Sequence, residues 1–292
     1  MRGGSAGHAG PGRVTSARAT GPMADPRKVV QVVRKVRAIL DVFTPERPEL
    51  TFREIQAAAQ LPSTTCFRLL TSLVAEGVLE RNGDRYRPGI RLLYWGAAAS
   101  SGLALQREAR PFLQALRDVT GESACLFVRD GTIRTCIALE ESRHSVIRLL
   151  YVGQVMPLHA GSAGRVILAF DEEARQRVLI GDLPAYTPHT ITDRQVLRDE
   201  LERVRRQGYA VTREERDMGA ASISAPVFGS GGKFLAALGI AGPALRFTPD
   251  AVAAWIPEVV AAARKLSARM GFRGAWDGHD GEAGGDFPDS AE

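Results

Sequence analysis

The segment from Thr51 to Gly77 constrains the fold most, because it holds two short helical patterns separated by a sharp break. Thr51 and Glu54 stand three residues apart, the spacing of a capping box in which a hydroxyl and a carboxylate satisfy free amides at a helix start. That helix should run to about Ala59, where Gln60-Leu61-Pro62 breaks it. A second helix follows, and this order predicts a helix-turn-helix.

The second helix is predicted to begin with Ser63 as its cap and to end at Gly77. Phe67, Leu70 and Leu73 recur at helical spacing and are expected to face the core. Another amphipathic helix should precede the motif, since apolar residues recur between residues 29 and 43.

A hairpin is predicted after the second helix. Val78–Arg81 and Arg85–Arg87 flank Asn82-Gly83-Asp84, and Asn-Gly favours a tight turn because both residues tolerate positive φ. Residues 27–88 therefore predict a winged helix-turn-helix.

Such a module offers two surfaces to DNA. An α-helix fits the major groove, where each base pair shows its own donor and acceptor pattern, and hairpin cations suit phosphates or the minor groove. The net charge of +5 allows a nucleic-acid partner. Two other interpretations stay open at this point. The winged helix could bind protein instead of DNA, and the hairpin arginines could form only a solvent-exposed face without a binding role. The candidate DNA-binding residues are Ser63, Thr64, Thr65, Arg68, Arg81, Arg85 and Arg87.

The rest of the chain divides by composition. Residues 1–26 predict a disordered leader, and residues 273–292 predict a disordered acidic tail. Residues 89–104 are apolar and rich in small side chains, which predicts a connecting helix that either pairs subunits or packs on the first domain.

Residues 105–272 mix helices with antiparallel hairpins, which predicts an α+β fold rather than a doubly wound parallel sheet. Thr192 should cap a helix that stops at Gly208, and Thr248-Pro249 should start a long last helix. The helix before the first hairpin should turn Phe112 and Val119 inward. The expected strands are 124–129, 132–139, 146–152, 223–228 and 234–240.

Three cysteines far apart in the sequence make neither a disulfide framework nor a zinc site, which fits a reducing cytoplasm. Cys125 and Cys136 lie in apolar strand patterns and should pack in the core. No apolar run approaches the roughly 18 residues of a membrane span, and the first residues lack the apolar core of a signal peptide.

Three stretches of the chain resemble the IclR family of bacterial transcription regulators. The first joins Ala38–Phe43 with Leu61–Leu70 and Glu76–Arg81, and the second is Gly153–Val166. The third runs from Leu201 to Val211 and continues through Glu214-Glu215, Ile223–Phe228 and Gly239–Pro243.

The resemblance implies an N-terminal winged helix-turn-helix and a C-terminal effector domain of GAF/profilin-like shape with a mostly antiparallel sheet. It implies a homodimer or dimer of dimers on near-palindromic operators in double-stranded DNA, with repression the expected outcome. The chain departs from the family at Gln60, where a glycine is common. A positive φ there would cost Gln60 on the order of 1 kcal/mol.

The resemblance also implies an effector site at the loop before the helix predicted for Val166–Phe170. Ser162 is placed to cap that helix, and free amides at a helix start attract carboxylates. Gly239 and Ala241 stand where relatives that bind a two-carbon acid have serines, so we expect a larger, less polar pocket for an aromatic or branched carboxylate. The candidate effector-binding residues are Ser162, Ala163, Gly164, Thr212, Ser222, Gly239 and Ala241.

The competing class is a hydrolase-like enzyme domain fused to a protein-binding winged helix. His159, Ser162 and Glu214 or Glu215 supply the residue types of a hydrolase trio. However, Ser162 does not lie in a Gly-x-Ser-x-Gly elbow, and the chain has no phosphate-binding loop and no His-Glu-x-x-His. We therefore expect no catalysis, no cofactor and no metal, and a structural hydrogen bond for His159.

Overall fold

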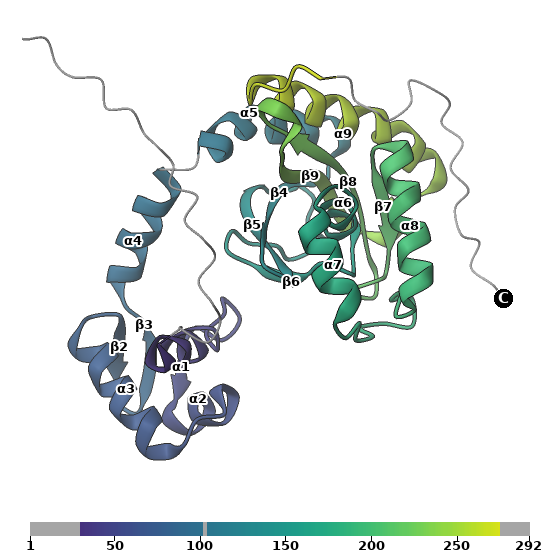
Figure 1. Cartoon of the computed structure of the whole chain (residues 1–292). Helices are drawn as coiled ribbons and strands as arrows, with labels where there is room; N and C mark the ends of the chain where they lie inside the picture. Colours follow the sequence, from purple (N-terminus) through teal and green to yellow (C-terminus); the bar gives the residue numbers. More distant parts are fainter. Residues whose placement is uncertain (1–29, 102–103, 275–292) are drawn as a thin grey trace, which may run out of the picture. The chain divides into compact units, whose positions relative to one another are not determined.

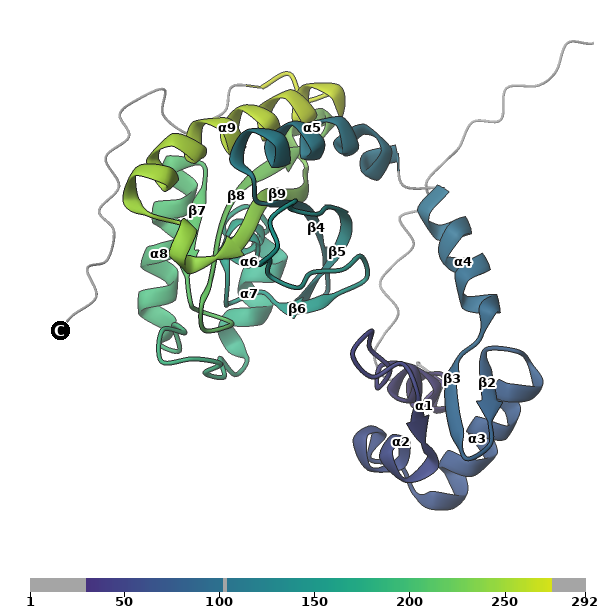
Figure 2. The ribbon, with the colours of Figure 1, turned by 180° about the vertical axis from the view of Figure 1, so that it is seen from behind.

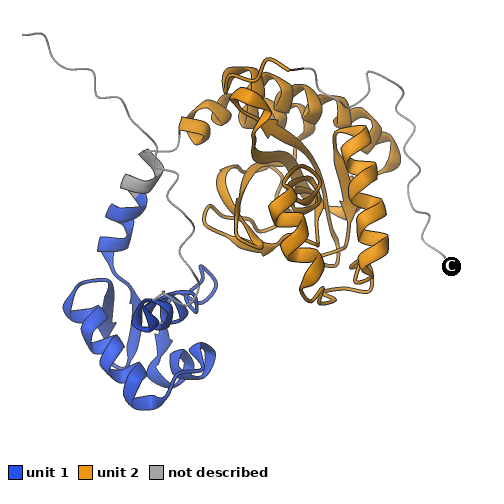
Figure 3. Ribbon diagram, in the orientation of Figure 1, with its two compact units in different colours: residues 1–99 blue, residues 100–292 orange. Residues whose placement is uncertain are grey.

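The computed structural model describes residues 30–101 and 104–274, and of residues 97–101 only the backbone. The chain forms two compact units, residues 1–99 and residues 100–292 (Figure 3). The predicted leader 1–26 and nearly all of the predicted tail 273–292 lie outside the described residues.

The N-terminal unit packs three helices against a small antiparallel sheet (Figure 1). Its core includes Ile39, Ile55 and Leu70, one from each helix. The helices are α1 (Gln31–Leu40), α2 (Phe52–Ala59) and α3 (Ser63–Ala75), and the strands, in the order β1-β3-β2, are β1 (Leu50–Thr51), β3 (Arg85–Pro88) and β2 (Leu79–Asn82).

The turn between α2 and α3 follows the sequence pattern closely. The capping box is present: Thr51 N–H donates to Glu54 Oε2 at 2.8 Å, and Glu54 N–H donates to Thr51 Oγ1 at 3.4 Å. Gln60 ends α2 in the left-handed region with φ 52°, the conformation that glycine adopts without strain. The strain expected at Gln60 is therefore present in this turn.

Two local predictions in this unit were wrong. Pro62 stands at the cap position of α3, and the Ser63 side chain makes no capping bond. Phe67 is 56% exposed and meets Phe52 edge-on, because it lies beside the core face of α3 rather than on it. The predicted hairpin is confirmed; its turn has positive φ only at Gly83, and Asn82 remains in β2 and pairs with Arg85.

The unit ends in α4 (Ile90–Ser101), at the position of the predicted connecting helix. Leu92 packs against the core of this unit. Ile90, Leu93 and Tyr94 are exposed. The start of α4 thus both packs on its own unit and presents an apolar surface.

The C-terminal unit is built on a six-stranded sheet in which every neighbouring pair is antiparallel. This confirms the α+β fold class. The strands, in the order β6-β5-β4-β9-β8-β7, are β6 (Val155–Pro157), β5 (Ile133–Glu140), β4 (Ser123–Asp130), β9 (Phe234–Pro243), β8 (Ala220–Phe228) and β7 (Ala210–Arg213).

Helices cover both faces of this sheet (Figures 1 and 2). On one face, α5 (Ala104–Thr120) and α9 (Pro249–Arg269) bury a core that includes Leu113 and Leu266. On the other face, α6 (Ser162–Phe170), α7 (Glu172–Ile180) and α8 (Arg194–Gln207) cover Cys125 and Cys136. Both cysteines are therefore core residues, as predicted. Single 3-10 turns follow β8 and β9 at Ser230–Gly232 and Ala244–Arg246.

The structure corrects four predictions in this unit. Residues 146–152 form no strand, and the sheet edge is instead β6, which pairs with Ile133, Arg134 and Thr135. Asp193, not Thr192, caps α8, because its carboxylate accepts from the amides of Gln195 and Val196. Val119 is 62% exposed rather than inward. Gly161 occupies the cap position of α6, which leaves the Ser162 hydroxyl free for other partners.

Candidate DNA-binding and effector sites

The start of α3 presents the predicted reading residues on one side of the helix. Ser63, Thr64 and Arg68 are exposed and Thr65 is half-buried, while Cys66 and Leu70 face the core. Phe67 belongs to the same exposed surface, which the apolar pattern missed because an aromatic residue at core spacing looks buried. The first two turns of α3 therefore offer hydroxyls, one guanidinium and one aromatic ring.

The three hairpin arginines are not equivalent. Arg85 and Arg87 alternate with the buried Tyr86, so they share one face of the hairpin, while Arg81 lies opposite Tyr86 with its guanidinium 5.6 Å from the ring. Arg87 Nη2 pairs with Glu80 Oε2 at 2.7 Å, which raises the pKa of Arg87 and lowers that of Glu80. Arg85 instead donates to a backbone oxygen, that of Glu49, at 3.5 Å. Arg85 is thus the freer cation for a phosphate.

The predicted effector residues converge where the first turn of α6 meets the sheet. Thr212, Ser222 and Ala241 are directly opposite one another on β7, β8 and β9. Ser162, in the first turn of α6, donates to Ser222 Oγ at 2.8 Å, and Ser222 and Thr212 are 3.0 Å apart. The three hydroxyls form one buried network between helix and sheet.

Ser224 completes this hydroxyl network, and the sequence interpretation did not include it. Its hydroxyl is 2.8 Å from that of Ser162, and it lies two residues after Ser222, hence on the same face of β8. The period of two residues along a strand could have identified it. Gly239 pairs with Ser224, and a methyl group on Gly239 would come within 2.5 Å of the Ser224 hydroxyl. The Ser224 hydroxyl thus occupies space that the missing side chain of Gly239 leaves.

Gly164 has a packing role in the same turn. A methyl group there would collide with the carbonyl of Leu158, because α6 crosses the preceding loop at this point. Ala163 is buried within the core beneath α6. These two residues therefore set how closely the first turn of α6 approaches the loop.

Buried charges hold the loop before α6. Gly161 N–H donates to Glu215 Oε2 at 3.0 Å, and Arg165 Nη2 donates to Glu215 Oε1 at 2.6 Å. Arg165 also pairs with Glu200 at 2.9 Å. Burial raises the pKa of Glu215, and Arg165 opposes that shift. Glu215 is thus engaged in tying the loop to α6.

The residues of the hydrolase interpretation are not assembled into a trio. His159 Nε2 is 2.9 Å from the Pro184 carbonyl, and its ring lies beside that of Tyr186. Ser162 bonds to serines and Glu215 to Arg165. His159 thus has the structural hydrogen bond that was expected, and burial lowers its pKa.

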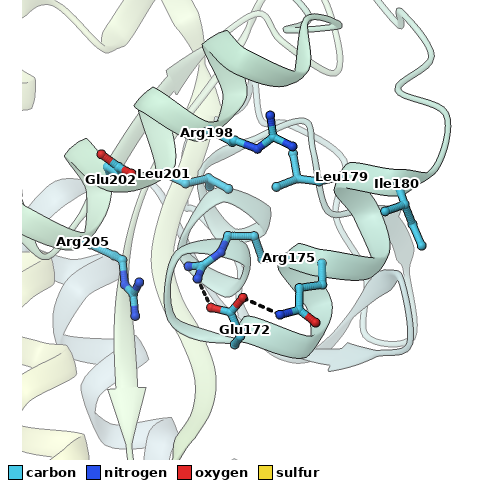
Figure 4. A pocket seen from close by; sticks show the side chains of 9 residues that line it. Glu172, Arg175, Leu179, Ile180, Arg198, Leu201, Glu202 and Arg205 are labelled. Carbon is cyan, nitrogen blue, oxygen red and sulfur yellow. Dashed lines mark hydrogen bonds and ion pairs between the residues drawn. The ribbon is translucent and has the colours of Figure 1, made fainter.

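A surface pocket of about 360 Å³ lies between α7 and α8, away from this network (Figure 4). Glu172 is held there by Arg175 and Gln176. None of the predicted effector residues lines it. Its lining is Glu172, Arg175, Gln176, Leu179, Ile180, Arg198, Leu201, Glu202 and Arg205.

Among residues 30–101 and 104–274, no group of three or more His, Cys, Asp or Glu side chains could hold a metal ion. In that same part of the chain, every helix is too short or too polar to cross a membrane.

Both units match known families. The model described as the IclR helix-turn-helix domain matches residues 32–83, and the model described as Bacterial transcriptional regulator IclR C-terminal matches residues 97–268. The second match alone covers more than half of the chain.

Individual proteins agree with these matches. The HTH-type transcriptional regulator BhcR of Paracoccus denitrificans is 31% identical over 228 residues, which are 77% of this chain and 82% of BhcR. The HTH-type transcriptional repressor AllR of Salmonella typhi is 29% identical over 85% of this chain and 92% of AllR. The crystal structure of an IclR homolog complexed with 4-hydroxybenzoate, from Microbacterium hydrocarbonoxydans, superposes with a TM-score of 0.69 at 27% identity over 82% of this chain and 98% of that one. The chain belongs to the IclR family of bacterial transcriptional regulators, which bind DNA through a helix-turn-helix and are not enzymes.

Proposed function

We propose that this regulator represses transcription from a near-palindromic operator, and that a small organic acid bound in the C-terminal unit modulates its operator binding. The observation that carries the proposal is the buried hydroxyl network of Ser162, Ser222 and Thr212 at the first turn of α6, in a unit separate from the helix-turn-helix. The relative AllR is named a repressor, which supports the sign of the regulation.

On the DNA side, Ser63, Thr64, Thr65 and Arg68 of α3 would reach the bases of the major groove. Arg81, Arg85 and Arg87 of the hairpin would bind phosphates or the minor groove. Exposure of Ser63, Thr64 and Arg68 on one side of α3 supports this assignment.

On the effector side, we assign Ser162, Ala163, Gly164, Thr212, Ser222, Gly239 and Ala241 to binding. Their convergence on one turn of α6 supports the assignment. The ligand class is an aromatic or branched carboxylate. The structural relative complexed with 4-hydroxybenzoate, an aromatic carboxylate, supports this choice.

The working assembly is proposed to be a homodimer or a dimer of dimers in the cytoplasm, with functional parts 27–88, 89–104 and 105–272. Exposed Ile90, Leu93 and Tyr94 on α4 supply an apolar surface for pairing. The acid would shift the population between two dimer geometries, so that the spacing of the two recognition helices changes against the half-sites.

One experiment tests both halves of the proposal. The intergenic DNA beside the protein's own gene is footprinted, with and without 4-hydroxybenzoate, 3-methylbutanoate and glyoxylate, and the same acids are tested by thermal unfolding. We expect a two-fold symmetric footprint that weakens steeply with salt, and stabilisation by the larger acids. A stabilising shift with glyoxylate alone would overturn the ligand class, and salt-insensitive or absent DNA binding would overturn the operator assignment.

A further inference from the structure

Arg134 is a buried cation in β5 for which the described residues supply no ion-pairing carboxylate. Only 3% of the Arg134 surface is exposed to solvent. Nη1 donates to the Pro157 carbonyl, Nη2 approaches Met156 Sδ at 3.8 Å, and Nε has no hydrogen-bond partner. A buried guanidinium without a counter-charge is costly to the folded state.

The Arg134 guanidinium lies directly against the first turn of α6. A methyl group on Gly161 would be 2.9 Å from Nη2, and one on Gly164 would be 2.6 Å from Nη1. The first amides of a helix have no acceptor within the helix and carry positive partial charge. The guanidinium of Arg134 and the free amides of α6 therefore place two sources of positive charge at the same turn, beside Ser162.

Neighbouring side chains increase the excess of positive charge around Arg134 instead of neutralising it. Arg148 Nη2 and Arg216 Nη1 both contact Asp217 Oδ2, at 2.6 and 2.9 Å, so two guanidiniums share one carboxylate oxygen. Burial, followed by repulsion from Arg216 and Arg148, lowers the pKa of Arg134 to about 9, which leaves it charged at neutral pH. Glu215, whose charge also reaches Arg134, is already bound to Gly161 and Arg165.

We propose that Arg134 is the residue that recognises the charge of the effector: its guanidinium binds the carboxylate of the acid, together with the first amides of α6. This inference rests on the proposed effector site and names the residue that selects an acid over a neutral analogue. A planar guanidinium suits a carboxylate because two of its N–H groups match the two oxygens. Arg134 was not among the residues expected to bind effector, since one arginine in a strand pattern carries no sign of burial.

A purely structural role makes a different prediction. If Arg134 only holds the Pro157 carbonyl, its removal lowers stability and leaves the preference among ligands unchanged. The discriminating quantity is therefore the ratio of affinities for an acid and for its primary amide, which has nearly the same shape and no charge.

The test compares the wild type, Arg134→Met and the control Arg129→Met by isothermal calorimetry. Arg129 lies opposite Arg134 on β4, but it pairs with Asp171 at 2.8 Å and with Glu173 at 3.0 Å. The probes are 4-hydroxybenzoate and 3-methylbutanoate, each with its primary amide. We expect Arg134→Met to weaken acid binding by about 10- to 100-fold, with little change for the amide, while Arg129→Met behaves as the wild type.

Two outcomes overturn the inference, and they differ. If the wild type prefers acids and Arg134→Met keeps the same acid-to-amide ratio, Arg134 does not recognise the charge and the proposed effector site still stands. If the wild type binds none of the acids, both the inference and the acid effector fail, while the footprint still reports DNA binding. Should Arg134→Met not fold, Arg134→Lys keeps the charge but loses the planar fork, and an unchanged acid-to-amide ratio in that variant overturns the two-point contact.

Discussion

The hydroxyl of Ser162 in α6 donates to the hydroxyl of Ser222 in β8 at 2.8 Å, although 60 positions separate the two residues in the sequence. The same Ser162 oxygen is 2.8 Å from that of Ser224. Ser162 therefore links the start of α6 to two positions on one face of the sheet. Any group that enters this turn must exchange hydrogen bonds with hydroxyls that already satisfy one another.

Ser162→Ala should destabilise the protein more than Ser224→Ala does. The first change removes two buried hydrogen bonds and the second removes one, and each is worth about 1 kcal/mol. We expect losses of about 2 and about 1 kcal/mol in the free energy of unfolding, measured by urea denaturation. Equal losses would mean that Ser162 does not connect the network.

Arg68→Ala and Arg85→Ala should weaken operator binding more than Arg87→Ala. Arg87 already pairs with Glu80, so a phosphate must compete with that carboxylate, whereas Arg85 donates only to a backbone oxygen at 3.5 Å. In gel-shift titrations over a range of salt, Arg85→Ala should lower the slope of log K against log salt by about 1. Arg87→Ala should lower that slope less. If Arg68→Ala leaves the affinity unchanged, the recognition helix has been placed incorrectly.

Gln60→Gly should stabilise the N-terminal unit. Gln60 has φ 52°, where a side chain is strained and glycine is not, so we expect a gain of about 0.5–1 kcal/mol after the added entropy of the unfolded glycine. Gln56→Gly is the matched control. Because Gln56 lies inside α2, a glycine there should lower the free energy of unfolding by about 1 kcal/mol. Thermal unfolding of the two variants should shift in opposite directions.

Local patterns predicted the elements well where the signal lies within a few residues. The capping box at Thr51 and the stop at Gly208 were both found in the structure, since each depends on backbone geometry that the neighbouring residues determine. Errors occurred where two adjacent residues compete for one role. Thr192 and Asp193 both suit a helix cap, and only the backbone path places the Asp193 carboxylate over the amides.

Long-range features were harder to read. The short strand β1 forms only because Leu50 and Thr51 meet Tyr86 and Arg85 far along the chain. Burial of Arg134 likewise depends on the distant loop that holds Pro157 and Gly161. A sequence pattern indicates the two-residue period of a strand but not which distant residues pack on it. The charged neighbour of the hydroxyl network, Arg134, was missed for this reason.

The Asp193 cap of α8 should make the stability of the protein depend on pH, and the variants Asp193→Ala and Asp193→Asn test this dependence. Hydrogen bonds from the amides of Val196 and Gln195 lower the pKa of Asp193 below its ordinary 3.8. A carboxylate with a lowered pKa in the folded state stabilises the protein above its ordinary pKa, and that contribution disappears as the pH falls through the lowered value. Asp193→Ala should therefore lower the melting temperature at pH 7, with the difference from wild type shrinking toward pH 3.

Asp193→Asn keeps an oxygen that can cap without titrating, so it should stay close to wild type at pH 7. Thr192→Ala should change little at either pH, and a loss at pH 7 comparable to that of Asp193→Ala would show that the threonine shares the cap in solution.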